Sequence, residues 1–147
     1  MTRPRLTTGA AAGSVPAMHP FRAAVEARDH DAMVACLTDD VLLYSPVAFK
    51  PFSGKESVRG LFDALFQVFE DFRYVDELEG ERSHALIFRA TVGGRDIEGL
   101  DHMVFDDDGL VTEFTVMMRP LSALVAMRDA MSARVEHLAK GEVAKTG

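Results

Sequence analysis

The order of secondary-structure signals along the chain predicts an α+β fold, in which a cone-shaped, curved, mixed or antiparallel β-sheet carries helices on its concave face. Helical periodicity dominates from residue 20 to about 69 and is broken by one short strand. Four consecutive β-rich runs follow, and a last helical segment closes the chain. A curved sheet covered by helices leaves a hollow between the layers, where we expect a small apolar ligand to bind.

The composition predicts one acidic globular domain. The chain has 147 residues, of which 48% are hydrophobic and 27% charged, and its formal net charge is -7. Because no basic stripe is present, we expect neither nucleic acid nor an anionic membrane as a partner. No apolar segment approaches the ~20 residues that a membrane span requires. The single cysteine, Cys36, excludes an intrachain disulfide and lies in an apolar helical run, which favours a core thiol over a nucleophile.

We predict a disordered leader over residues 1–17, a single domain over 18–140 and a frayed tail over 141–147. The leader has Arg3 and Arg5 but no hydrophobic centre, so we interpret the protein as cytoplasmic rather than secreted. The five histidines form no helical pair and no cluster with cysteine, so no metal and no cofactor is expected.

The first half is predicted to be helical apart from one strand. Residues 20–28 have helical spacing, with proline in the first turn. Asp29 is suited to cap a second helix, which should end near residue 38 at two adjacent aspartates. A strand over 41–45 stops at a proline, and a third helix with a wide apolar stripe runs over 54–69.

The second half is predicted to be a run of antiparallel strands followed by a helix. Alternating patterns separated by glycine-containing turns cover residues 72–79, 83–92, 95–105 and 110–118. Pro120 should start the last helix and Gly141 should end it.

Asp101 is the most informative residue of these strands. It shares one face of its strand with Ile97, Gly99, Met103 and Phe105, so a lone carboxyl lies on an otherwise apolar face. A buried carboxyl either finds a partner or stays protonated and donates a hydrogen bond. The alternative is an aspartate near the strand end that solvent reaches.

His84 is the second candidate for proton transfer. It alternates with Leu86 and Phe88 on the preceding strand, and we expect that face to look inward, toward Asp101. The alternative is a histidine at a strand end in contact with solvent. His102 alternates away from Asp101 and should lie on the opposite face.

Several short segments occur in a characteristic order between residues 21 and 118. They are Ala27–Met33, Asp39–Val41 leading to Ser45–Val47, the helix start Ser53–Lys55, and Asp101–His102 before a turn that ends at Gly109. In their order and spacing the chain resembles the nuclear-transport-factor-2-like superfamily, on the branch that holds ketosteroid isomerases and SnoaL-like polyketide cyclases. The resemblance implies a cystatin-like or SnoaL-like roll.

The resemblance also assigns roles, position by position. Ketosteroid isomerases place a general-base aspartate where this chain has Ser45, and an oxyanion-binding tyrosine where it has Phe21. Their second donor, a carboxylic acid held neutral, matches Asp101. A lone serine is a poor base and a phenyl ring donates nothing, so steroid isomerisation by that mechanism is not expected. In the more loosely similar SnoaL-like cyclases, an aspartate acts as acid and base in closing a polyketide ring.

Two functions remain open. One is a cofactor-independent isomerase, cyclase, dehydratase or hydrolase that acts on a hydrophobic carbonyl compound, with Asp101 as acid and His84 beside it. The other is a non-catalytic module that binds a lipophilic molecule, or a dimeric scaffold. We expect the pocket to be lined by Phe21, Ser45, Phe62, Phe66, Leu86, Phe88, Met103, Phe114 and Val116.

We also expect a homodimer that forms through the outer face of the sheet. Leu100, Val104, Val111 and Met117 should place apolar groups on that face. The alternative is that the terminal helix covers them.

Overall fold

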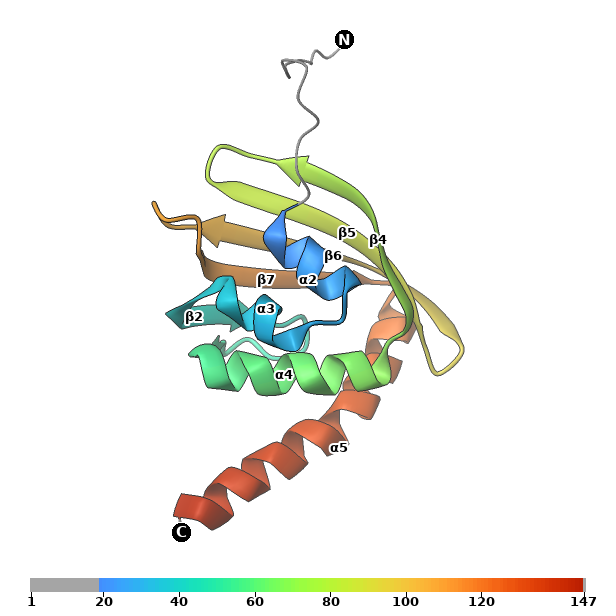
Figure 1. The fold of residues 1–147 in the computed structure, drawn as a ribbon. Coiled ribbons are helices and arrows are strands. Elements are labelled where there is room, and N and C mark those ends of the chain that lie inside the picture. The colour runs from blue at the N-terminus through green and yellow to red at the C-terminus, as the bar shows by residue number, and fades with distance from the viewer. Residues whose placement is uncertain (1–18, 147) are drawn as a thin grey trace.

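The computed structural model describes residues 19–146 and confirms the α+β fold, with one six-stranded mixed sheet and four helices in that range (Figure 1). The predicted leader lies outside the described residues. In chain order the elements are α2 Pro20–Glu26, α3 His30–Ala35, β2 Leu37–Tyr44, β3 Phe52–Ser53, α4 Lys55–Val68, β4 Glu70–Glu79, β5 Ser83–Val92, β6 Arg95–Phe105, β7 Val111–Arg119 and α5 Leu121–Thr146.

The sheet has the strand order β3-β2-β7-β6-β5-β4. Strands β4 to β7 form an antiparallel meander, whereas β2 pairs in parallel with β7, so the sheet is mixed. Figure 1 shows the sheet curving, with α2, α3 and α4 on its concave side. Aromatic rings join the two layers: the ring of Phe21 on α2 lies 5.2 Å from that of Phe114 on β7. The apolar core therefore lies between the helices and the concave face.

The short helix α3 begins as predicted but ends earlier. Asp29 caps it by accepting a hydrogen bond from the Ala32 N–H at 3.1 Å. The helix stops at Ala35 because the next residue joins the sheet: the carbonyl of Cys36 accepts from the N–H of Val111 at 2.8 Å. The predicted break at residues 39–40 is wrong, since both aspartates lie in β2, where the register with β7 shifts.

The last helix is longer than predicted. It continues through Gly141 to Thr146, so the expected helix end at Gly141 is wrong. Figure 1 shows α5 leaving β7 and passing beside α4, and the two helices are in contact. Its first turns are fixed by the buried side chains of Ala123, Met127 and Met131. These three residues belong to the same apolar core as the other helices and the sheet.

A β-bulge in β4 changes which side chains face inward. The pairing with β5 slips between Tyr74 and Asp76, so two consecutive residues, Val75 and Asp76, are exposed. Tyr74 is buried before the slip, and Glu77 is partly buried after it. One strand therefore places a phenol and a carboxyl on the concave side, three residues apart.

Gly99 is required by close packing on the concave face. A Cβ atom at this position would lie 2.1 Å from Cζ of Phe88 on the neighbouring strand. Because Gly99 has no side chain, the Phe88 ring can lie across β6, next to the position of Asp101.

Three of the four residues predicted on the outer face of the sheet are exposed or half-buried, and one is buried instead. Met117 is 60% exposed, and Leu100 and Val104 are half-buried. Val111 is instead fully buried, because the register between β6 and β7 slips near Phe105. Within residues 19–146, no helix combines the length and the apolar character that crossing a bilayer requires.

Candidate active site

Asp101 lies on the concave face of β6 and is 6% exposed. Its Oδ2 accepts a hydrogen bond of 2.9 Å from the hydroxyl of Tyr74, which comes from β4, two strands away. Tyr74 is 7% exposed, so the pair is shielded from water. In the described part of the chain, Tyr74 is the partner of the Asp101 carboxyl, which leaves Oδ1 available to a ligand. The alternative of a solvated Asp101 is therefore wrong.

Burial sets the protonation of this pair. It raises the pKa of Asp101 to about 7, and the hydrogen bond from Tyr74 opposes the rise. The pKa of Tyr74 is raised well above its ordinary value by burial and then by the neighbouring carboxylate. Near neutral pH, Tyr74 therefore keeps its proton, while Asp101 is divided between its acid and its carboxylate forms.

The cavity around this pair, called here the Asp101 pocket, is small and aromatic. Its volume is about 30 Å³, which is room for one or two water molecules. Its lining residues are Phe21, Val25, Phe62, Leu65, Phe66, Phe69, Phe72, Tyr74, Phe88, Asp101, Phe114, Val116 and Met118. The hollow expected next to Asp101 is therefore mostly filled by aromatic side chains.

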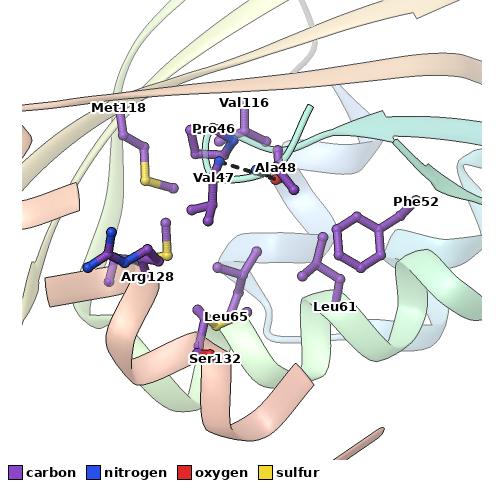
Figure 2. A pocket seen from close by; sticks show the side chains of 13 residues that line it. Pro46, Val47, Ala48, Phe52, Leu61, Leu65, Val116, Met118, Arg128 and Ser132 are labelled. Atoms are coloured by element: carbon purple, nitrogen blue, oxygen red, sulfur yellow. Dashed lines mark hydrogen bonds between the residues drawn. The ribbon is translucent and has the colours of Figure 1, made fainter. Parts of the chain in front are cut away.

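A larger cavity, called here the Val47 pocket, adjoins it and has a volume of about 220 Å³. It lies between the loop after β2, helix α4 and helix α5, and Figure 2 shows Val47 pointing into it from the loop. It is lined by Ser45, Pro46, Val47, Ala48, Phe52, Leu61, Leu65, Val116, Met118, Met127, Arg128, Met131 and Ser132. Leu65, Val116 and Met118 line both pockets, so these side chains lie between the larger space and the Asp101 pocket.

Ser45 lines the Val47 pocket, but its hydroxyl is hydrogen-bonded to the backbone of the loop. Its Oγ accepts hydrogen bonds from the N–H groups of Val47 at 3.3 Å and Ala48 at 3.1 Å. Both bonds hold the turn that follows β2. No titratable side chain contacts this hydroxyl among the hydrogen bonds of the described residues, so it has no base to activate it.

The predicted pairing of His84 with Asp101 is wrong. Its Nε2 lies 2.6 Å from Oε2 of Glu77, the carboxyl that the β4 bulge turns inward. Oε1 of Glu77 accepts from Arg22 at 2.9 Å, which ties α2 to the sheet. The ring of His19, just before α2, lies 5.0 Å from that of His84. His84 thus belongs to a separate polar cluster, defined here as His19, Arg22, Glu77 and His84.

The other predicted pocket residues divide into three groups. Phe21, Phe62, Phe66, Phe88, Phe114 and Val116 line the Asp101 pocket. Ser45, as described, lines the Val47 pocket. Leu86 and Met103 line neither pocket: both are fully buried in the core. In the pairing of β5 with β6, Leu86 lies opposite Asp101 and Met103 lies opposite His84.

Sequence reasoning missed Tyr74 and Arg128. Tyr74 alternates with Phe72 at the start of β4, and this pattern was sufficient to place both on the inner face. Arg128 follows the buried Met127 on α5, and nothing in the periodicity distinguishes it from the other charged residues of that helix. Within residues 19–146, no group of three or more His, Cys, Asp or Glu side chains could hold a metal ion.

Comparison with known proteins supports the same architecture. The family model of the SnoaL-like domain matches residues 19–114. An uncharacterised protein with a cystatin-like fold from Silicibacter pomeroyi DSS-3 is 34% identical, with a TM-score of 0.77, over 84% of this chain and 90% of that one. A steroid delta-isomerase from Pseudomonas aeruginosa is 35% identical, with a TM-score of 0.75, over 86% of this chain and 99% of that one.

A more distant structure shares the fold alone. It is a SnoaL-like protein of unknown function from Burkholderia thailandensis E264, which is 23% identical, with a TM-score of 0.57, over 69% of this chain and 90% of that one. We found no match among curated proteins.

Proposed function

The chain belongs to the SnoaL-like domain family of the nuclear-transport-factor-2-like superfamily, and from this premise we propose that it is a cofactor-independent enzyme of the isomerase or cyclase type. Its substrate is a hydrophobic carbonyl compound, and Asp101 is its acid. The observation that carries the proposal is the buried Asp101–Tyr74 pair, whose carboxyl is held partly protonated near neutral pH beside an apolar pocket.

The proposed chemistry uses Asp101 in both protonation states. Oδ1 carries the acidic proton to the carbonyl oxygen of the substrate, while Tyr74 holds Oδ2. A group whose pKa lies near the working pH can give a proton in one step and take one in the next. The carboxylate left after Oδ1 protonates the carbonyl oxygen takes a proton from the carbon next to that carbonyl, which gives the neutral enol and restores the acid. One shuttling carboxyl therefore replaces the separate base that ketosteroid isomerases keep at the position of Ser45. Tyr74 supports Asp101 as a positioning residue, although it comes from a different element than the tyrosine of those isomerases.

The substrate body occupies the Val47 pocket in this proposal, and its carbonyl reaches past Met118. Methionine is unbranched and adopts several rotamers at low cost, so its movement joins the two pockets. The lining of both pockets is apolar almost throughout, which favours a lipophilic body over a sugar or a nucleotide.

The test has two stages. A thermal-shift screen of steroids, polyketides and aromatic ketones should give a ligand that stabilises the protein, and turnover of that ligand is then followed. Replacement Asp101→Asn keeps the shape of the side chain but removes the transferable proton, so turnover should fall roughly a hundredfold or more. Unchanged turnover in this variant would contradict the proposal.

A non-catalytic lipophilic-ligand-binding protein is the alternative function. It is favoured by the described residues that line the two pockets, among which Asp101 is the one carboxyl and no histidine is present. Under this alternative, ligands from the screen bind to the wild type and to Asp101→Asn with equal affinity, and neither protein converts them.

We also propose that two copies associate through the outer face of the sheet. The support is an apolar surface on that face that includes Leu100 and the exposed Met117. Replacement Met117→Lys should convert a dimer to a monomer in light scattering after size exclusion. A wild type that is monomeric at all concentrations would contradict this association.

A further inference from the structure

Among the described residues that line the Val47 pocket, one side chain is formally charged, and that charge is positive. Of the 13 residues that line it, Arg128 is the exception among apolar groups and two serines. The chain as a whole is acidic, with a net charge of -7. An arginine beside an apolar cavity in an acidic protein favours a ligand that carries a negative charge.

The guanidinium of Arg128 keeps N–H donors available to a ligand. Its side chain is 54% exposed, and it pairs with the carboxyl of Asp129, the next residue of α5, at 3.1 to 3.2 Å. An exposed pair of this kind contributes little energy and uses few of the five N–H donors of arginine. Figure 2 shows Arg128 at one side of the pocket, near Met118, with Phe52 at the other side.

Asp101, which lines the adjoining pocket, makes the two possible orientations of an anionic ligand unequal in energy. Asp101 is buried and gains negative charge as the pH rises through about 7, so an anion beside it is repelled in a dry environment. An anionic group of the ligand is therefore favoured at Arg128 and disfavoured at Asp101.

We propose that the Val47 pocket takes an amphipathic acid: an apolar body with a carboxylate or similar anion bound by Arg128. The anion site rests on the pocket and on Arg128. Only the orientation of the carbonyl toward Asp101 rests on the proposed function. Arg128 is thus a specificity-determining residue, which neutral lipophilic compounds do not engage.

Two dyes with the same ring system test this inference. The anionic dye 8-anilinonaphthalene-1-sulfonate has a sulfonate that N-phenyl-1-naphthylamine lacks, and both become fluorescent in apolar sites. The wild type should bind the sulfonate dye more tightly. Replacement Arg128→Gln should weaken that binding roughly three- to tenfold and leave the neutral dye unaffected, as expected for loss of one partly exposed charged contact.

Arg134→Gln is the matched control. Arg134 lies on the same helix, bonds to Gln67 and does not line the pocket, so this variant changes the net charge equally. Asp129→Asn is expected to act in the opposite direction, because it frees the guanidinium, and should tighten binding of the sulfonate dye. Added salt should weaken that dye's binding to the wild type more than to Arg128→Gln.

Equal losses in Arg128→Gln and Arg134→Gln, or no preference of the wild type for the sulfonate, would overturn the inference. Its failure is distinct from failure of the proposed function. If Asp101→Asn turns over substrate normally while the dye preference depends on Arg128, the acid role is wrong and the anion site stands. The reverse result leaves Asp101 as the acid and removes the anion site.

Discussion

Two carboxyl groups on the concave face of the sheet, Asp101 and Glu77, have opposite protonation behaviour. Burial raises the pKa of Asp101 to about 7, and a neutral phenol is its partner. Burial also favours a higher pKa for Glu77, but hydrogen bonds from Arg22 and His84 outweigh it, so the pKa of Glu77 is lowered. The charge of the partner, rather than burial alone, decides which form a buried acid adopts.

The two carboxyl groups therefore differ in role: Glu77 stabilises the fold, whereas Asp101 belongs to the proposed functional site. Glu77 joins α2 to the sheet through Arg22, and both of its carboxyl oxygens have a hydrogen-bond partner, one of which is the Arg22 cation. Asp101 has no cation as a hydrogen-bond partner in the described chain, and ionising it costs free energy of folding. Proteins tolerate such a cost mainly where function requires the group.

The largest effect is expected from Asp101→Asn in alkaline conditions. In the wild type, unfolding releases a proton between the ordinary pKa of aspartate and about 7, so the free energy of unfolding falls as the pH rises through this window. The asparagine variant lacks this loss. By urea denaturation the two proteins should be similarly stable near pH 4, and the variant should be more stable by roughly 3–4 kcal/mol near pH 8. Parallel pH profiles would contradict the comparison.

Glu77→Gln should give a smaller effect of the opposite sign. Near pH 7 the variant should be less stable by roughly 1–3 kcal/mol, because charge-assisted hydrogen bonds to Arg22 and His84 are weakened. A lowered folded pKa stabilises the protein above the ordinary pKa of glutamate, and this stabilisation is lost as the pH falls through the folded value. The difference between the variant and the wild type should therefore shrink in acid.

Glu81→Gln, in the exposed turn between β4 and β5, is the control for Glu77. It removes the same charge at a site without these partners and should change stability by less than about 0.5 kcal/mol. A similar loss in both variants would show that net charge, rather than the Arg22–Glu77–His84 contacts, is responsible.

Apart from the control Glu81→Gln, Tyr74→Phe should have the smallest effect on stability, and it should also shift the titration of Asp101. Loss of the hydroxyl should cost about 1 kcal/mol, the usual net contribution of one hydrogen bond. Because this bond opposes the rise of the Asp101 pKa, its removal should move the alkaline loss of stability to higher pH. A shift to lower pH would mean that Tyr74 does not stabilise the carboxylate.

Strand alternation was sufficient to predict the position of Asp101, because β6 is regular around it and places Ile97, Gly99 and Met103 on the same buried face. The helix cap at Asp29 was predictable for a similarly local reason. Both features depend on residues within a few positions of each other, which the sequence displays directly.

The errors arise where one strand slips against another. The bulge after Tyr74 turns Glu77 inward, and a similar slip near Phe105 buries Val111. Alternation counted along one strand does not reveal an extra residue, because the slip depends on the partner strand. Glu77 becomes the partner of His84 because of such a slip, and aromatic side chains fill the Asp101 pocket through long-range packing. Neither feature could be predicted without the structure.

A direct titration of the Asp101 carboxyl tests the central claim of this account. Carbon-13 NMR of the aspartate side-chain carboxyls, with Asp101→Asn used to assign the signal, gives its midpoint without any substrate. Because burial raises the pKa of Asp101, the midpoint of its titration should lie at about 7. A midpoint near the ordinary value of ~3.9 would mean that the carboxyl is solvated and ionised at neutral pH, and that it is not the acid of this pocket.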